Sequence, residues 1–392
     1  MSKVKSIGIF IPSFKNGGVE RVASNLSIYL DEEIDKVLIT YLDDIGDFQF
    51  DGRIVSLKSK LSKNPIKILF NLIKKYKEIK KIKRREKFDI CISMVESPNV
   101  MNVLTKGNER TYISIHSNKS FELGGVKKKL NQIFLRYFYN KADKIIVVSE
   151  GIKEDLVNNF GINQSKIKVI YNSIDTLRIE KLKKEKIESK ELDLFNEGST
   201  IINVGRLSKA KGQWHLIRAF SHVSKIKPEA KLIIIGEGEL RVYFEELIKS
   251  FKLENKVHLL GNKANPFKYM DKADVFGFSS IWEGFGLALV EALACGLPVV
   301  SSNCNSGPSE ILGNKTLKTD SMIQYCDYGL LVPVCDGKFY LGKEDLTIEE
   351  YILAEALLKL LDKNSLQKKY KESSLKRAIQ FQHENIINKW IN

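Results

Sequence analysis

Two glutamates eight residues apart, Glu283 and Glu291, stand at the ends of a segment that also holds two glycines. The segment follows the apolar run Val275–Phe278, which predicts a strand, and leads into a helical pattern. The glycines let a ligand approach the backbone closely, and the amides of Gly286 and Leu287 would open the helix and hold a phosphate. A carboxylate accepts hydrogen bonds from vicinal hydroxyls, so the two glutamates can bind two parts of one ligand. In the structural alternative, Glu283 caps the helix and Glu291 lies on its solvated face.

A second segment places two cations between an expected strand and an expected helix. Arg206 and Lys211 lie in the stretch Gly205–Gly212, which follows the apolar run Ile201–Val204. A strand-to-helix turn is a usual position for a diphosphate. The planar fork of arginine and the point charge of lysine together can neutralise a leaving diphosphate. The alternative is that these residues are exposed cations on a loop of a basic protein and bind no ligand.

The first half of the chain offers a glycine turn and a histidine. Asn16, Gly17 and Gly18 follow the first expected strand and precede a helix, so their amides can face a donor phosphate or an acceptor. His116 ends the expected strand Tyr112–Ile115, at the carboxyl edge of a parallel sheet where ligands bind. An ordinary glycine-rich turn and a structural histidine are the alternatives.

Short apolar runs alternate with longer amphipathic stretches, a pattern that predicts parallel sheets covered by helices on both faces. The alternation stops at Leu177–Thr200, which is dense in Lys and Glu, and then restarts. We therefore expect an α/β protein with two Rossmann-like, doubly wound parallel-sheet domains facing a cleft. The expected domains are residues 1–180 and 181–375, with a C-terminal helix at 376–392 that packs back on the first domain. The expected strands are Ser6–Ile11, Val37–Tyr41, Ile90–Met94, Tyr112–Ile115, Lys144–Ser149, Ile201–Val204, Lys231–Ile235, Lys256–Leu260, Val275–Phe278 and Pro298–Ser301.

Composition narrows the possible classes of protein. The 392 residues suit two domains of roughly 100–200 residues each. The net charge of +15 is compatible with nucleic acid, an anionic membrane surface or a phosphorylated ligand. No run of about 18 apolar residues predicts a transmembrane helix. Five widely spaced cysteines form neither a disulfide framework nor a zinc motif, which favours a reducing cytoplasm.

Three motifs in this order resemble glycosyltransferase family 4: the stretch Gly205–Gly212, the triplet Gly236–Gly238, and Glu283 with Glu291. The resemblance is strong over residues 201–312 and looser in the first half. It implies the GT-B fold, a retaining glycosyltransferase and a nucleotide-sugar donor bound by the C-terminal domain. The triplet lacks the third glycine of a dinucleotide fingerprint, since Arg241 stands there, so hydride transfer is disfavoured.

The resemblance also implies a role for each candidate residue. Glu283 contacts the donor sugar, and His116 reaches the transferred sugar from the N-terminal side; these two are the expected catalytic residues. The expected donor-binding residues are Arg206 and Lys211 on the diphosphate, Glu291 on the ribose hydroxyls, and the backbone of Gly286, Leu287, Gly17 and Gly18. No cofactor and no metal are expected, because the sequence contains no Asp-x-Asp triplet that would hold a metal on the diphosphate.

The segment Ser306–Leu312 resembles members that build bacterial surface polysaccharides, although a plain helix start with Pro308 in its first turn and Ser306 as its cap is the alternative. The expected partners are a UDP-linked hexose or N-acetylhexosamine and a lipid-linked or oligosaccharide acceptor. The alternatives are a nucleotide-sugar epimerase, a sugar phosphorylase, or a catalytically silent sugar-nucleotide-binding scaffold.

One basic stretch, Lys58–Lys87, interleaves apolar and cationic residues with helical spacing. It is either a helix packed on the core with a solvated basic back, or a helix resting against anionic lipid. No recognised RNA or DNA module appears, so no nucleic-acid partner is expected. The expected location is the cytoplasm, with peripheral association at the inner face of the plasma membrane.

Overall fold

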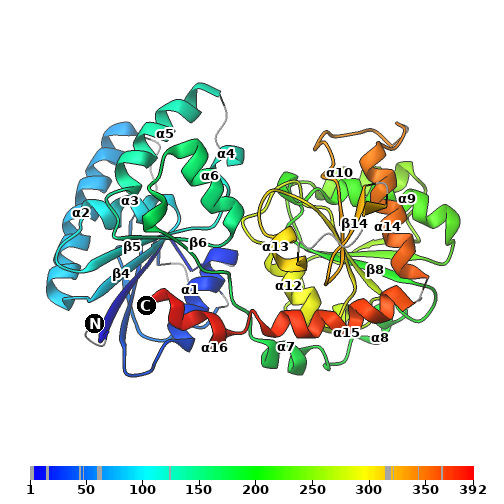
Figure 1. Ribbon diagram of the computed structural model, residues 1–392, viewed down its shortest axis with the longest axis horizontal. Helices are drawn as coiled ribbons and strands as arrows, with labels where there is room; N and C mark the ends of the chain where they lie inside the picture. Colours follow the sequence, from blue (N-terminus) through cyan, green and yellow to red (C-terminus); the bar gives the residue numbers. More distant parts are fainter. Residues whose placement is uncertain are drawn as a thin grey trace. The chain divides into compact units, whose positions relative to one another are not determined.

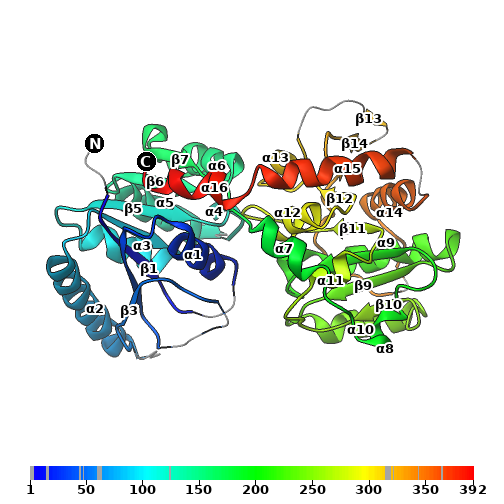
Figure 2. The same cartoon turned by 90° about the horizontal axis from the view of Figure 1, so that it is seen from below.

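The computed structural model describes residues 4–14, 17–43, 46, 48–59, 64–122, 125–313, 319–320, 322–342, 344–362 and 365–392. Asn16 and residues 60–63 of the basic stretch lie outside these ranges. The chain forms two compact units, drawn from two sides in Figures 1 and 2. Unit 1 combines Met1–Ser173 with His383–Asn392, and unit 2 is Ile174–Gln382.

Unit 1 contains a seven-stranded parallel sheet with the strand order β3-β2-β1-β4-β5-β6-β7. Its strands are β1 (Ser6–Ile11), β2 (Asp35–Thr40), β3 (Arg53–Ser56), β4 (Ile90–Met94), β5 (Arg110–Ile115), β6 (Lys144–Val147) and β7 (Ile167–Val169). Helices cover both faces of this sheet (Figure 1). They are α1 (Gly18–Tyr29), α2 (Pro65–Glu86), α3 (Glu96–Leu104), α4 (Lys119–Glu122), α5 (Gly125–Tyr139), α6 (Glu150–Phe160), η1 (Gln164–Lys166), α16 (His383–Ile386) and η3 (Ile387–Trp390).

Unit 2 contains an eight-stranded sheet with the order β10-β9-β8-β11-β12-β15-β14-β13. The first six strands of this order are parallel, whereas β14 pairs antiparallel with both β15 and β13. The strands are β8 (Thr200–Val204), β9 (Lys231–Ile235), β10 (Val257–Leu259), β11 (Val275–Phe278), β12 (Val299–Ser302), β13 (Thr319–Asp320), β14 (Ile323–Tyr325) and β15 (Leu330–Val332). The helices are α7 (Thr176–Leu182), α8 (Ser189–Leu192), η2 (Lys209–Lys211), α9 (Gln213–Ile226), α10 (Arg241–Ser250), α11 (Phe267–Met270), α12 (Leu287–Ala294), α13 (Pro308–Leu312), α14 (Ile348–Leu361) and α15 (Ser365–Ile379).

The predicted fold class is confirmed: both units carry a doubly wound, parallel-dominated sheet between helices. In each sheet the strand order reverses beside the first strand of the unit, between β1 and β4 and between β8 and β11. The loops that follow such a pair of strands diverge to opposite faces, which leaves a crevice at the carboxyl ends where ligands bind. The loops after β1, β4, β8 and β11 are therefore the first places to look for a site.

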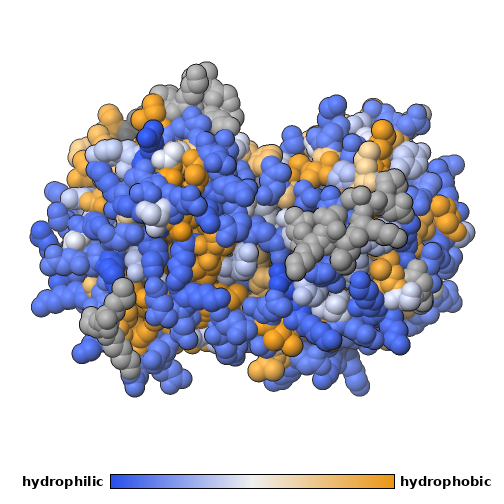
Figure 3. All heavy atoms as spheres, viewed as in Figure 1, coloured by the Kyte–Doolittle hydropathy of each residue, from blue (hydrophilic) through white to orange (hydrophobic). Residues whose placement is uncertain are grey.

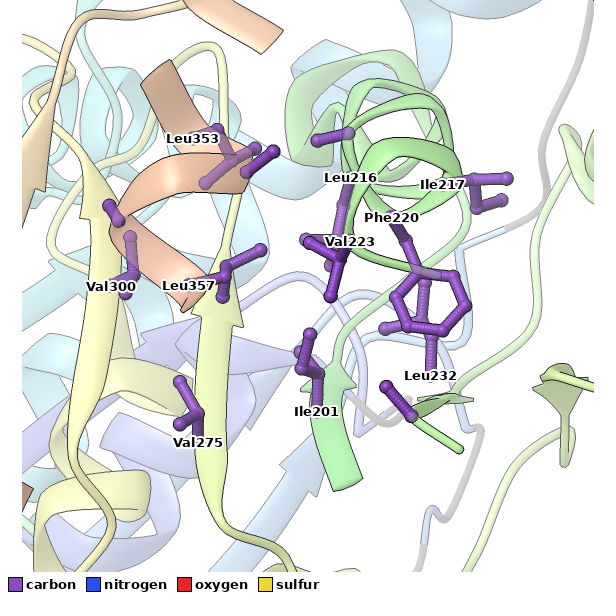
Figure 4. Packing of buried hydrophobic residues seen from close by; sticks show 14 of the residues in the cluster. Ile201, Leu216, Ile217, Phe220, Val223, Leu232, Val275, Val300, Leu353 and Leu357 are labelled. Atoms are coloured by element: carbon purple, nitrogen blue, oxygen red, sulfur yellow. The ribbon is translucent and has the colours of Figure 1, made fainter. Parts of the chain in front are cut away.

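A continuous apolar core holds the strands of unit 2 in place (Figure 4). Phe220 and Val223 of α9 pack over Ile201 of β8 and Leu232 of β9, and all four side chains are fully buried. Burying a side chain of this size stabilises the fold by about 1.5–3 kcal/mol. The loops at the ends of these strands consequently extend from a rigid base.

Unit 1 is completed by a segment that lies far away in the sequence. His383 stacks on Tyr29 of α1, with ring centroids 3.8 Å apart, and its Nδ1 atom lies 2.8 Å from the Ser173 hydroxyl. Lys168 of β7 donates to the Lys389 carbonyl at 3.0 Å, and Trp390 is buried. Residues 383–392 are thus an integral part of unit 1.

Candidate functional site

An ion pair joins the loops that follow two neighbouring strands of unit 2, β8 and β11. The Lys211 Nζ atom, after β8, lies 2.6 Å from Oε1 of Glu283, after β11. The Ser280 hydroxyl donates to the same oxygen at 2.7 Å. The Glu283 side chain is only 9% exposed and that of Lys211 is 28% exposed, so both are partly withdrawn from water. The structure thus brings two of the predicted site residues together at the reversal point of the sheet.

Backbone contacts hold these two loops against each other. The Ile281 amide donates to the Ala210 carbonyl at 2.8 Å, and the Ser279 hydroxyl donates to the Lys211 carbonyl at 3.2 Å. Gly212 has a φ of +58°, and a Cβ there would lie 2.4 Å from the Ser279 carbonyl oxygen. Only glycine allows this approach, so Gly212 is needed to position Lys211 opposite Glu283.

Arg206 lies on the same loop but in a different environment. Its side chain is 73% exposed, and Nη2 lies 3.1 Å from Oε2 of Glu239, after β9. Such an exposed ion pair contributes at most about 1 kcal/mol, so an incoming anion can replace Glu239 at little cost. A Cβ at Gly236 would lie 2.0 Å from the Gly205 carbonyl oxygen, which shows that the triplet beginning at Gly236 packs the β9 loop against the β8 loop.

The short helix α12 carries the remaining residues of the motif. Gly286 is its N-cap, with a φ of +100°, and Leu287 is its first residue, so their amides lie at the positive end of the helix. Glu283 precedes the N-cap and does not cap the helix. Glu291 is buried, at 6% exposed, and does not lie on a solvated face. The structural alternative is therefore wrong for both glutamates.

A neighbouring turn packs on this loop and corrects one part of the plain helix-start alternative. Gly307, not Ser306, is the N-cap of α13, whereas Pro308 occupies the first turn as that alternative has it. A Cβ at Gly307 would lie 1.8 Å from the Phe285 carbonyl oxygen, so glycine is required where the two turns meet. Burial raises the pKa of the nearby Cys304 thiol to about 12, and this buried thiol is unreactive at neutral pH.

Ser280 is a member of this site that was not predictable from the sequence. Its position three residues before Glu283 is the only signal it carries, and serine is common in loops. The hydrogen bond to Glu283 becomes visible only when the loop is folded.

His116 belongs to unit 1, where it follows β5. Its Nε2 atom lies 2.9 Å from the Ser114 hydroxyl. Burial lowers the pKa of His116 to about 3, and the positive charge of Lys119 acts in the same direction. The imidazole is therefore neutral at physiological pH and acts as a hydrogen-bonding group without a charge.

A cavity of about 410 Å³ lies at the reversal point of the unit 1 sheet. Val19 of α1, Val95 after β4 and His116 after β5 line it. Gly17 is the N-cap of α1, and a Cβ at Gly18 would meet no atom within 4 Å. The glycine turn and His116, far apart in the sequence, thus border the same region of unit 1.

A larger cavity, of about 890 Å³, lies at the other end of the strands of this sheet, where their amino ends are. Lys83, Phe88 and Arg110 are among the residues that line it, at the amino ends of β4 and β5. Ligands of doubly wound sheets bind at the carboxyl ends, and Lys83 is already paired with Glu109 at 2.6 Å. We therefore place the candidate site at the carboxyl ends despite the smaller volume there.

Within the described ranges, no group of three or more His, Cys, Asp and Glu side chains is arranged to hold a metal ion. The charged groups that the folded site offers an anionic ligand are those of Lys211 and Arg206, supplemented by the amides that open α12. The buried and half-buried carboxylates beside them can accept hydrogen bonds from the hydroxyl groups of a ligand. The arrangement in unit 2 can bind a molecule that has both phosphates and hydroxyls.

Each half of the chain matches a known protein family. Residues 16–178 match Glycosyltransferase Family 4, and residues 184–324 match Glycosyl transferases group 1. An uncharacterized glycosyltransferase of Methanocaldococcus jannaschii is 34% identical over 357 residues, which cover 87% of this chain and 88% of the relative.

A second relative, from Campylobacter jejuni, is 33% identical and is covered to 96%, as is this chain. It is named N-acetylgalactosamine-N,N'-diacetylbacillosaminyl-diphospho-undecaprenol 4-alpha-N-acetylgalactosaminyltransferase. Among solved structures, a glycosyltransferase from Rickettsia africae has a TM-score of 0.76 at 20% identity, covering 99% of this chain and 97% of its own. Anabaena HepE in complex with UDP and glucose has a TM-score of 0.74 at 20% identity, covering 99% and 98%.

Proposed function

The chain belongs to the family 4 glycosyltransferases, whose group 1 domain forms its second half, and on this basis we propose a specific reaction for it. The protein transfers a hexosyl or N-acetylhexosaminyl unit from a UDP-linked donor to a lipid-linked or saccharide acceptor, with retention of configuration. The pathway is surface-polysaccharide assembly. The observation that carries the proposal is the pairing of Lys211 with Glu283 at the reversal point of the unit 2 sheet. The printed name of the Campylobacter jejuni relative supports the lipid-linked acceptor, and the UDP and glucose bound to HepE support the donor.

The donor binds to unit 2 through groups whose chemistry matches its parts. Lys211, Arg206 and the α12 amides carry the charge of the diphosphate. Glu283, held by Ser280, accepts hydrogen bonds from hydroxyls of the donor sugar, and Glu291 accepts those of the ribose. Lys211 exchanges one oxyanion partner, the Glu283 carboxylate, for a phosphate oxygen without a change of loop position.

The chemical step breaks the bond between the anomeric carbon and the leaving diphosphate oxygen. The acceptor oxygen forms its bond to the same carbon on the same face, and its proton passes to the diphosphate oxygen. Lys211 and Arg206 stabilise the negative charge that develops on the leaving group. His116, neutral in the folded chain, offers a hydrogen bond to the sugar and carries no proton away.

Three other functions remain as competing hypotheses. An epimerase would isomerise a bound nucleotide sugar, a phosphorylase would transfer a sugar to or from inorganic phosphate, and a silent scaffold would bind the donor without turnover. Lys211, Arg206, Glu283 and Glu291 are all present, which favours a catalytically active transferase over the scaffold.

The purified chain is expected to hydrolyse one member of a nucleotide-sugar panel slowly, and to turn it over faster when a membrane extract supplies acceptor.

Activity should persist in a chelator, because cationic side chains and helix amides replace a metal on the diphosphate. Released nucleotide is the measured quantity. The complete absence of turnover on every donor would refute the transferase, and activity that vanishes in chelator and returns with magnesium or manganese would refute metal independence.

We propose in addition that unit 1 docks on an anionic membrane through α2. The C-terminal half of this helix packs on the core through the buried Ile79 and Ile82. Its N-terminal half instead exposes apolar side chains, with Ile66 and Phe70 66% and 67% exposed. The C-terminal half of α2 thus fits the hypothesis of a helix packed on the core, and its N-terminal half fits the hypothesis of a helix resting against lipid.

The neighbouring helices extend this apolar surface. The short helix α3 contacts both α2 and α5, and α5 exposes Ile133 and Tyr137. Figure 3 shows apolar atoms on the part of unit 1 where Figure 1 draws α2 and α5. Lysines follow the apolar residues along α2, and each adds about 1 kcal/mol near an anionic surface. The described helices are each too short or too polar to cross a bilayer, so the contact would be peripheral.

The full chain is expected to co-sediment with vesicles that contain phosphatidylglycerol, and less so as salt is added. Phe70→Ser should weaken this binding several-fold because it removes apolar area that enters the interface. Leu341→Ser, at a strongly exposed apolar position of unit 2, is the matched control and should bind as the parent does. Failure to bind anionic vesicles at low salt would contradict the proposal, as would equal binding of the two variants.

A further inference from the structure

The turn that carries Arg206 and Lys211 is attached to two different loops. Its beginning is bonded to the loop after β9, where the Leu207 amide donates to the Glu237 carbonyl at 3.0 Å. Its end is bonded to the loop after β11 through the carbonyls of Ala210 and Lys211, as described above. The separation of the two cations therefore depends on what connects the beginning of the turn to its end.

The side chain of Gln213 makes such a connection. Gln213 is the first residue of α9, directly after the turn, and it is fully buried. Its Nε2 atom donates to the Gly205 carbonyl at 3.3 Å and to the Arg206 carbonyl at 3.1 Å. The side chain at the end of the turn thus reaches back to the two residues that begin it. A carbonyl oxygen only accepts, so these bonds also fix which end of the amide faces the turn.

A second buried amide connects Gln213 to the strand that precedes Glu283. Gln213 Nε2 also donates to Oδ1 of Asn203 at 3.3 Å, and the Asn203 Nδ2 atom donates to the Gly277 carbonyl at 2.7 Å. Asn203 belongs to β8 and Gly277 to β11, so the two strands that lead into the site share this network. Side chains as well as backbone thus set the position of the turn relative to β11.

One oxygen of the Gln213 amide lacks a partner. The Oε1 atom is buried, and it accepts no hydrogen bond from the part of the chain that the structure describes. Burying an unpaired polar atom costs free energy, because its bonds to water are lost and not replaced. Glutamine therefore occupies this position in spite of a stability cost, and what its amide contributes is the set of bonds to β8 and to the turn.

We propose that Gln213 is a positioning residue that holds the turn closed, so that Arg206 and Lys211 bind one diphosphate together. Without it, Arg206 can move with the β9 loop and Lys211 with the β11 loop, and the two charges lose their fixed geometry. Because it is fully buried, Gln213 has no surface with which to touch the donor and acts through the two cations. The assignment rests on the proposed function and deepens it, because it names a residue that organises the diphosphate part of the donor site.

Isothermal titration calorimetry of the full chain with inorganic pyrophosphate tests the proposal and does not require the donor sugar to be known. Binding that Lys211→Ala abolishes is binding at this turn. Gln213→Met keeps the length of the side chain but removes the amide, and the loss of its bonds to the turn should raise the dissociation constant about tenfold. Ser221→Ala is the matched control: it removes a buried hydrogen bond of the same helix, to the Arg218 carbonyl at 2.7 Å, and should leave the affinity unchanged.

A double-mutant cycle separates positioning from a general loss of structure. If Gln213 acts through Arg206, Gln213→Met should have much less effect in a chain that already carries Arg206→Ala, whereas independent effects would add. Thermal unfolding checks the fold of each variant. If Gln213→Met does not fold, Gln213→Asn decides, because its shorter side chain keeps the polarity but draws the amide away from the two carbonyls.

The proposal is wrong if Gln213→Met binds pyrophosphate as tightly as the parent chain, or if its effect adds in full to that of Arg206→Ala. Either result would leave the proposed function intact. A parent chain that binds pyrophosphate independently of Lys211, or not at all, would instead contradict the diphosphate site of the proposed function, and the role of Gln213 would fall with it.

Discussion

Replacing Lys211 by alanine is expected to lower kcat for sugar transfer by about two to three orders of magnitude. The Nζ atom is already held at 2.6 Å from an oxyanion, so it is preorganised for the charge that develops on the leaving diphosphate. Removing one such preorganised group typically costs about 3 kcal/mol of transition-state stabilisation. Steady-state kinetics with the donor identified in the hydrolysis panel measure the effect. Arg206→Ala should change the rate in the same direction.

The matched control for this variant is Lys209→Ala. Lys209 lies two residues earlier in the same turn, carries the same charge and is exposed. It should retain activity near that of the parent chain. Full activity in both Lys211→Ala and Arg206→Ala would show that the diphosphate is bound elsewhere.

Glu283→Gln is expected to lower turnover by about 10²-fold or more while preserving the configuration of the product. Glutamine keeps the shape and an oxygen that can accept the Ser280 hydroxyl, but it loses the charge that orders Lys211. The donor sugar would then be positioned loosely, and correct positioning accounts for several kcal/mol of a barrier. Glu246→Gln, at an exposed position of α10, is the control and should leave turnover unchanged.

Proton NMR of the first-formed glycoside gives the configuration that the parent chain and Glu283→Gln produce. An α-linked donor should give an α-linked product. A β-linked product would exclude retention. A glycosyl adduct on Glu283, detected by mass spectrometry of the intact protein, would instead replace the same-face step with a covalent intermediate.

Strands with uninterrupted apolar runs were predictable in position as well as in type. Lys231–Ile235 and Val275–Phe278 have the predicted ends, because buried parallel strands require apolar side chains on both faces. Strands β3 and β7 were not predictable, because their residues are half-buried or exposed and form no such run. The antiparallel additions β13 and β14 were missed for a related reason, since each spans two or three residues.

The members of the unit 2 site were predictable from their motifs, but their contacts were not. Lys211 and Glu283 meet because β8 and β11 are neighbours in the sheet, although another strand, β9, follows β8 in the sequence. Val95 carried no signal at all. Its φ of +73° is a property of the folded backbone, and the residue type does not indicate it.

The last ten residues of the chain have a consequence for its synthesis. Unit 1 needs residues 383–392 to cover its α1 side, yet these emerge from the ribosome only after all of unit 2. At about 5–20 residues per second, the first 173 residues wait roughly 10–40 s for that segment. During this interval the surface that His383 and Trp390 will bury stays open to chaperones and to other nascent chains. The usual order, in which the N-terminal domain finishes first, is thus reversed: the second unit, continuous in sequence, can reach its complete structure before the first.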